Sequence, residues 1–229
     1  MGAYQDQQRK LFDDIEKSGF ADPSSSTLVS LDNSVDKRMC LTGIVFPPED
    51  ILKVLNSEVI EPLKSADPRH YYYPEKSLHF TIKNLKVVEY PIPYTDDDLI
   101  KAKSVFEEVI PRHKVFSFHA QGLFHLPVSI SIRGYTNESL KNIILDFDQV
   151  LEKAGIPDNK KYASPEVFFG NMNVCRYTTE PNEQFKKQLK KLKDIDIGTF
   201  EVKTVSLITT NLVCHPDKTT IIGEYTLPE

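Results

Sequence analysis

The chain has 229 residues, with 28 Lys and Arg against 33 Asp and Glu and a net charge of −5. This length suits a single large domain, and hydrophobic residues at 40% are typical of a globular protein rather than a disordered one. The small negative charge provides no surface-wide positive field, so we expect no binding to a DNA duplex.

The sequence carries no signal for a membrane or for secretion. No run approaches the roughly 18 apolar residues of a transmembrane helix, and the first residues are polar. Cys40, Cys175 and Cys214 form no C-x-x-C pair, and three is an odd number for a disulfide framework. We therefore expect a cytoplasmic protein, and we expect it to be a monomer.

The first predicted elements are a short helix, a linker and a buried strand. Residues 4–20 place apolar side chains at helical spacing, and the Pro-Ser-Ser-Ser run that begins at Pro23 is typical of a linker. The apolar run 38–46 predicts a buried strand, which Pro47 and Pro48 end.

The next predicted elements are a helix, a strand and a second helix. Apolar residues spaced by three and four predict one helix over 52–63. Residues 78–85 alternate apolar and polar side chains and predict a half-buried strand. A capping-box pattern at Thr95 predicts the start of the second helix, which ends before Pro111.

The middle of the chain predicts two strands and a helix. Residues 115–121 and 128–133 alternate as half-buried strands do. Residues 140–154 form the clearest amphipathic helix. Gly155 follows it directly, at the position where a glycine in the left-handed conformation commonly ends a helix.

The last third predicts a strand over 167–176, a short basic helix over 185–192, and strands over 200–213 and 219–227. Strands and helices alternate irregularly, and no glycine-rich turn joins a strand to a helix. This pattern favours an α+β fold with antiparallel sheets over a doubly wound parallel sheet.

One short motif carries recognisable chemistry. In the predicted strand 78–85, His79, Thr81 and Lys83 share the polar face. An imidazole beside a hydroxyl suits a phosphate, because the imidazole exchanges a proton near neutral pH while the hydroxyl donates to a phosphate oxygen. The alternative is an ordinary histidine and threonine on the polar face of a strand.

Other common catalytic motifs are absent. The sequence contains no Walker loop, dinucleotide fingerprint, H-E-x-x-H or G-x-S-x-G, and its six histidines do not have metal-ligand spacing. We therefore expect no metal and no organic cofactor.

The segment 73–82, Tyr-Pro-Glu-Lys-Ser-Leu-His-Phe-Thr-Ile, resembles the first motif of the two-histidine phosphoesterase superfamily, the RNA ligase/cyclic phosphodiesterase-like group. The order of elements over 38–227 resembles that family too. The resemblance implies one domain over 38–229, preceded by an N-terminal helix and linker over 1–37. It implies two lobes whose antiparallel sheets face a central cleft, with helices packed outside.

The second motif of that family is incomplete in this chain. In the segment 168–176, Asn171 stands at the histidine position and Asn173 at the hydroxyl position, while Arg176 matches a basic residue that often follows. The family hydrolyses cyclic or 2′,5′-linked phosphodiesters with one imidazole as base and the other as acid. Asparagine does not titrate, but its amide can still donate to a phosphoryl oxygen.

Several further residues have two interpretations. Tyr73, with its neighbours Tyr71 and Tyr72, could stack a base beside the phosphate or could pack at the start of a strand. His119 and Arg133 lie on polar strand faces and could join the groove. A basic run favours the solvated face of a helix over an RNA groove; it comprises Lys186, Lys187, Lys190, Lys191 and Lys193.

Three functions remain open on these residues. The leading hypothesis is a metal-independent phosphodiesterase that acts on a nucleotide or RNA end, with His79 and Thr81 catalytic and with Tyr73, Asn171, Asn173 and Arg176 binding the substrate. The second is a non-catalytic module of the same fold that binds a nucleotide or RNA end. The third is a protein-interaction domain whose cleft is vestigial.

Overall fold

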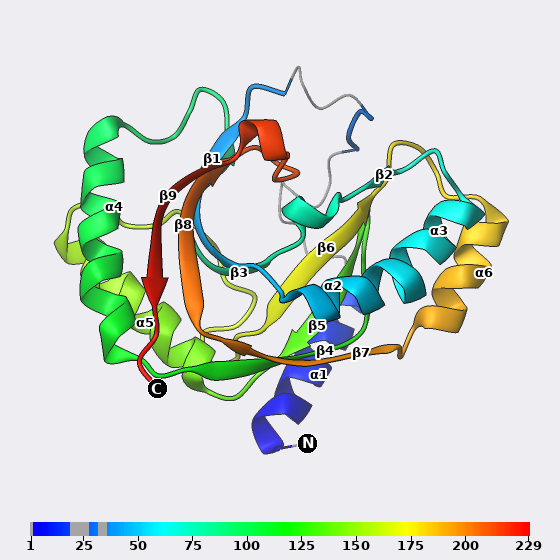
Figure 1. The fold of residues 1–229 in the computed structure, drawn as a ribbon, viewed down its shortest axis with the longest axis horizontal. Coiled ribbons are helices and arrows are strands. Elements are labelled where there is room, and N and C mark those ends of the chain that lie inside the picture. Colours follow the sequence, from blue (N-terminus) through cyan, green and yellow to red (C-terminus); the bar gives the residue numbers. More distant parts are fainter. Residues whose placement is uncertain (1, 19–27, 32–35) are drawn as a thin grey trace.

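The computed structural model describes residues 2–18, 28–31 and 36–229. Two antiparallel sheets organise this part of the chain (Figure 1). The first has the order β3 (Phe80–Glu89), β1 (Met39–Val45), β8 (Thr204–Thr210), β9 (Thr220–Thr226). The second has the order β2 (Tyr71–Tyr72), β6 (Gly170–Arg176), β5 (Ser129–Tyr135), β4 (Phe116–Leu126), β7 (Asp196–Val202). The predicted α+β class with antiparallel sheets is confirmed, whereas most of the predicted linker lies outside the described residues.

Helices cover the outer faces of both sheets (Figure 1). The first sheet packs against α4 (Asp96–Val109) and α5 (Ser139–Lys153). The second packs against α2 (Glu49–Leu55), α3 (Glu61–Ala66) and α6 (Glu183–Leu192). Short helical turns complete the chain: η2 (Asn56–Ile60), η3 (Glu75–Ser77), η4 (Ile110–Arg112) and η5 (Pro216–Lys218).

The predicted ends of two helices are confirmed by their capping contacts. The Thr95 hydroxyl accepts from the backbone N–H of Asp98, and the Asp98 side chain accepts from the backbone N–H of Thr95, so α4 begins with a capping box. Gly155 follows α5 with a φ of +74°, the left-handed conformation that glycine adopts without strain.

Two predicted elements are divided differently in the structure. The single helix predicted over 52–63 is α2, a π-helical turn and α3 in succession. The strand predicted over 200–213 is two strands, because β7 pairs with β4 in the second sheet whereas β8 pairs with β1 in the first. Alternation along a strand reports which side chains are buried but does not report which sheet the strand joins.

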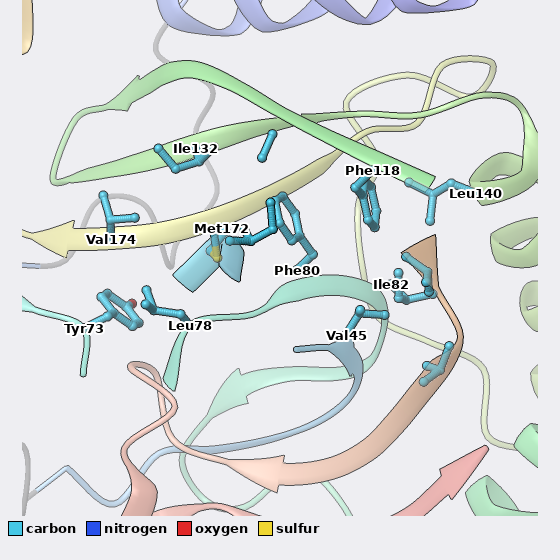
Figure 2. Close-up of a cluster of buried hydrophobic side chains, with 14 of the residues drawn as sticks. Val45, Tyr73, Leu78, Phe80, Ile82, Phe118, Ile132, Leu140, Met172 and Val174 are labelled. Carbon is cyan, nitrogen blue, oxygen red and sulfur yellow. The ribbon is translucent and has the colours of Figure 1, made fainter. Parts of the chain in front are cut away.

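The two sheets pack against each other through a shared hydrophobic core, in which an aromatic ring from each sheet stacks on the other (Figure 2). Phe80 of β3 stacks on Phe118 of β4 with ring centroids 4.7 Å apart and planes 14° apart. Gly134 and Gly170 are paired across β5 and β6, and a Cβ at either position would lie 2.6 Å from one of these rings. Glycine at these positions therefore lets β3 lie close to β6, which brings the two motif strands together.

The position predicted for Lys83 is wrong. Its side chain is not on the polar face of β3: only 1% of the residue is exposed, and its ammonium group contacts Asp148, Asp158 and the Tyr162 hydroxyl. The register of the pairing between β1 and β3 shifts between Gly43 and Ile44. A bulge of this kind reverses the alternation beyond it, so Thr81 and Lys83 no longer share a face.

One helix lies on the opposite side of the second sheet from the others. The α1 helix (Ala3–Ser18) packs on the face of β4 and β5 that carries Arg133 and Tyr135, and β6 presents Asn171 on this same face. Phe12 is fully buried there against Phe124, Tyr135 and Phe169. The helix thus belongs to the folded unit and occupies part of the surface that faces the cleft.

Candidate functional site

The complete and the incomplete motif both open into one cavity of about 280 Å³ between the sheets. The side chains in its lining come from β1, β3, β4, β5, β6 and β8, from α1 and α5, from the segments on either side of η3, and from the loops that follow α5 and β8. The lining includes all the predicted site residues: Tyr73, His79, Thr81, Asn171, Asn173 and Arg176. Tertiary structure therefore brings together two motifs that lie far apart in the sequence.

His79 stands immediately before β3 and is half-buried. Its Nδ1 donates to the carbonyl oxygen of Ser77 at 2.7 Å, so Nε2 is the nitrogen that remains for chemistry. The imidazole and the Cys214 thiol line the same cavity, and Ser77 contacts both residues: its carbonyl accepts from His79 Nδ1, and its hydroxyl donates to the Cys214 carbonyl. Burial lowers the pKa of His79, but Cys214 and the Ser77 carbonyl outweigh burial and raise that pKa above its ordinary value.

Three asparagines in the lining are held by their carbonyl oxygens. Asn173 Oδ1 accepts from Ser131 Oγ at 2.8 Å, Asn84 Oδ1 accepts from Thr42 Oγ1 at 3.1 Å, and Asn211 Oδ1 accepts from the backbone N–H of His215 at 2.9 Å. In each case the side-chain NH₂ group is the remaining donor. The cavity therefore offers amide donors with fixed orientation, which suits an anionic ligand.

The charged side chains in the described lining are all cationic. Lys160, Lys161 and Arg176 contribute to it, and no Asp or Glu does so among the residues that the structure describes. Arg176 is 4% exposed, and its Nε donates to the Tyr73 hydroxyl at 3.0 Å. An overall acidic chain thus concentrates positive charge and neutral donors in its cavity.

Tyr73 contributes to the site through its hydroxyl rather than through a free ring face. It is 3% exposed, and its ring packs edge-on against Tyr71 at 5.4 Å between centroids. A buried ring cannot receive a base in the way the stacking interpretation requires. Its position is that of a residue that orients the Arg176 guanidinium.

Other polar residues considered from the sequence lie outside the cavity lining. His119 pairs with Asp196 at 3.0 Å, and Arg133 pairs with Asp13 and Glu16 of α1. Of the basic run in α6, Lys186 pairs with Glu183 and with Glu180 on the outer surface. These contacts support the interpretation of α6 as a solvated helix face.

Sequence reasoning missed several residues of the site. Asn84, Lys161, Asn211 and Cys214 line the cavity, and Ile15 brings α1 to its wall. Cys214 and Asn211 follow β8 in a turn, where no local pattern indicates a role. Their positions depend on contacts that cross the whole chain, such as Ser77 Oγ donating to the Cys214 carbonyl at 2.6 Å.

Removing the Phe12 ring should detach α1 from the wall of the cavity. Phe12 is fully buried, and truncating a buried Phe to Ala costs about 3–5 kcal/mol. We expect Phe12→Ala to speed amide exchange in residues 3–18 by on the order of 10²-fold or more, while the sheets stay protected. Lys10→Ala is the control, because Lys10 is exposed on the same helix. Unchanged exchange in Phe12→Ala would contradict this packing.

Comparisons with known proteins support the fold. TT0787 of Thermus thermophilus superposes with a TM-score of 0.58 at 16% identity, over 83% of this chain and 97% of that one. Escherichia coli LigT complexed with ATP gives 0.57 at 10% identity, over 84% and 99%. A solved phosphoesterase gives 0.58 at 11% identity, over 84% and 99%. No family model and no curated protein matches the sequence. The predicted resemblance to two-histidine phosphoesterases is thus confirmed at the level of the fold.

Within residues 2–18, 28–31 and 36–229, no group of three or more His, Cys, Asp and Glu side chains is placed to hold a metal ion. No helix in these ranges has the length and apolar character needed to cross a membrane.

Proposed function

We propose that this protein binds the phosphorylated end of a nucleotide or RNA in its cavity and acts slowly, without a metal, on cyclic or 2′,5′-linked phosphodiesters. The observation that carries this proposal is the lining itself. One imidazole, oriented amide donors and three cationic side chains surround a space in which the described residues place no carboxylate. A phosphodiester monoanion matches this set of groups better than a cationic or apolar ligand does.

The groups support a division of roles in the reaction. His79 would exchange the proton, because its Nε2 is free of the Ser77 contact that holds Nδ1. Thr81, Asn171 and Asn173 would donate to the phosphoryl oxygens, and Arg176 would add charge. With asparagine at position 171, a second titrating imidazole is missing, so we expect turnover to be slow.

The solved relatives of the fold support a nucleotide-sized ligand. Structures of E. coli LigT were determined with ATP and, at a TM-score of 0.50, with 3′-AMP. In this chain α1 covers part of the second sheet and contributes Ile15 to the cavity wall. A cavity of about 280 Å³ closed on that side suits a mononucleotide or chain end better than an internal segment of RNA.

The non-catalytic binding module is the second candidate. The exchange of a titratable residue for Asn171 removes proton transfer while preserving hydrogen bonding to phosphate, which favours binding over turnover. The third hypothesis, a protein-interaction domain with a vestigial cleft, receives no support from the contacts described in the cavity.

A single set of measurements separates these candidates. A 2′,3′-cyclic mononucleotide, its linear 2′- and 3′-monophosphates and a 2′,5′-linked dinucleotide are titrated into the protein by calorimetry, and hydrolysis is followed by chromatography. We expect binding of the phosphorylated ligands and slow hydrolysis of the cyclic one. His79→Ala should reduce that hydrolysis by about 10²–10⁴-fold while binding changes by a few-fold.

The other outcomes assign the other functions. Binding without hydrolysis, weakened by Arg176→Gln, would establish the binding module. Absence of binding to every phosphorylated ligand would overturn the proposal and favour the interaction domain. Lys186→Gln is the matched control for lost positive charge, because Lys186 is paired on the outer surface of α6.

A further inference from the structure

Cys214 is a buried nucleophilic side chain that the proposed reaction does not use. It is 2% exposed, lines the cavity and has a backbone φ of +50°, a left-handed conformation that is uncommon for any residue but glycine. Its carbonyl accepts from Ser77 Oγ at 2.6 Å, and its Sγ lies 3.7 Å from Thr219 Oγ1. The thiol is therefore held in place at both its backbone and its side chain.

Cys214 and His79 lie in the same cavity lining and are joined through Ser77, whose Oγ donates to the Cys214 carbonyl and whose carbonyl accepts from His79 Nδ1. Because His79 Nδ1 donates to the Ser77 carbonyl, Nε2 is the nitrogen that can accept the thiol proton. Burial raises the pKa of Cys214, but His79 and the hydroxyls of Thr219 and Thr210 outweigh burial and lower it. A thiolate beside an imidazolium is the nucleophilic form of cysteine.

A second, independent feature in the cavity points to a ligand. Asn211 is 2% exposed, its Oδ1 is held by the His215 backbone N–H, and its Nδ2 has no hydrogen-bond partner. Leaving a buried amide donor unpaired is costly, so such a donor commonly serves an oxygen that arrives with a ligand. Asn211 belongs to the same turn as Cys214, since its carbonyl accepts from the Cys214 N–H at 3.2 Å.

We propose that Cys214 is a covalent modification site, at which the thiol paired with His79 reacts with a small hydroperoxide and the Asn211 amide donates to the oxygen it acquires. The thiolate sulfur attacks one peroxide oxygen, so an S–O bond forms and the O–O bond breaks. The leaving oxygen takes the proton of the His79 imidazolium and departs as water or an alcohol. Sulfur is oxidised by two electrons to a sulfenic acid, and the peroxide is reduced by two.

The other two cysteines serve as internal references. Cys40 lines the same cavity, but burial raises its pKa to about 12. Cys175 is fully buried in β6, and burial raises its pKa as well. Besides His79, the titratable groups coupled to Cys214 are the Cys40 thiol and the hydroxyls of Tyr71 and Tyr73, whose pKa values burial raises, so all three are neutral near pH 7. Comparing Cys214 with Cys40 therefore separates activation of a thiol from access to the cavity.

The test treats the native protein near pH 7 with hydrogen peroxide and dimedone and measures dimedone adducts at each cysteine by peptide mass spectrometry. We expect Cys214 to react at least about tenfold faster than Cys40 or Cys175. His79→Ala should slow Cys214 by about tenfold or more and move the midpoint of its rate against pH towards the ordinary thiol value near 8.5 or above. Equal rates at Cys214 and Cys40, or no effect of His79→Ala, would overturn the proposal.

Further variants test the oxidation of Cys214 independently of His79→Ala. If His79→Ala does not fold, Thr219→Val removes a hydroxyl that lies beside the sulfur, and it too should slow Cys214. Asn211→Asp keeps the oxygen that accepts from His215 but removes the amide donor, so it should reduce the sulfenic acid yield. Cys175→Ser should leave the reaction of Cys214 unchanged. None of these readouts depends on phosphodiester turnover, so the proposed function and this modification can fail separately.

Discussion

Replacing Asn171 by His together with Asn173 by Thr should raise hydrolysis of a 2′,3′-cyclic nucleotide by about 10²–10⁴-fold, which is the usual contribution of one general acid or base. The physical reason is the geometry of the cavity. Both asparagines line it opposite His79, and Ser131 Oγ donates to Asn173 Oδ1 at 2.8 Å, a contact that a Thr hydroxyl can also accept. An imidazole at position 171 would supply the second proton-transfer group.

The pH dependence adds a second readout. The contact with Cys214 raises the pKa of His79, so base catalysis by its neutral form should increase as pH rises through a value above the ordinary 6.5 of histidine. Because His79 and Cys214 influence each other's pKa, the single limb in the wild type belongs to the pair. The double variant should add a falling limb and produce a bell. His79→Ala in the double variant should remove the gain.

The matched control for this prediction is Asn84→His. Asn84 also lines the cavity, but it lies on β3 beside the first motif rather than across the cavity from it. A gain in both variants would show that any added imidazole helps, and a loss of binding in the double variant would contradict the proposed role of the amides. No gain with intact binding would favour the non-catalytic module.

Lys83→Met should destabilise the fold by about 3–5 kcal/mol, the usual cost of removing one partner of a buried ion pair. The ammonium group is buried and contacts the carboxylates of Asp148 and Asp158, one on α5 and the other in the loop that follows it. Without the cation, two carboxylates and the Tyr162 hydroxyl would remain close together. Chemical denaturation measured by circular dichroism gives the free energy of unfolding.

Two further variants test whether the lost stability of Lys83→Met comes from the buried charges. Lys86→Met is the control, because Lys86 is on the same strand and its ammonium group donates to the Pro157 carbonyl at an exposed position. It should cost well under about 1 kcal/mol, the scale of exposed surface contacts. Adding Asp148→Asn to Lys83→Met should recover part of the loss. Equal stability of Lys83→Met and the wild type would show that the three charged groups do not act as a buried cluster.

The sequence alone was sufficient for the elements whose signals are local. Helix α5 and its Gly155 cap, the capping box at Thr95 and the strand that directly follows His79 were all predicted, because periodicity and capping residues act over a few neighbouring positions. The first motif was recognisable for the same reason. Its similarity to a known family then implied the two-sheet fold and the positions of Asn171 and Asn173.

Tertiary structure decided the features that depend on contacts between distant segments. A bulge in β3 moved Lys83 from the polar face into a buried cluster, and a change of sheet at Lys203 divided one predicted strand into two. Cys214 became the partner of His79 only because the turn after β8 packs against the start of β3. Local patterns record which side chains are buried, whereas register, sheet membership and long-range packing determine which side chains meet.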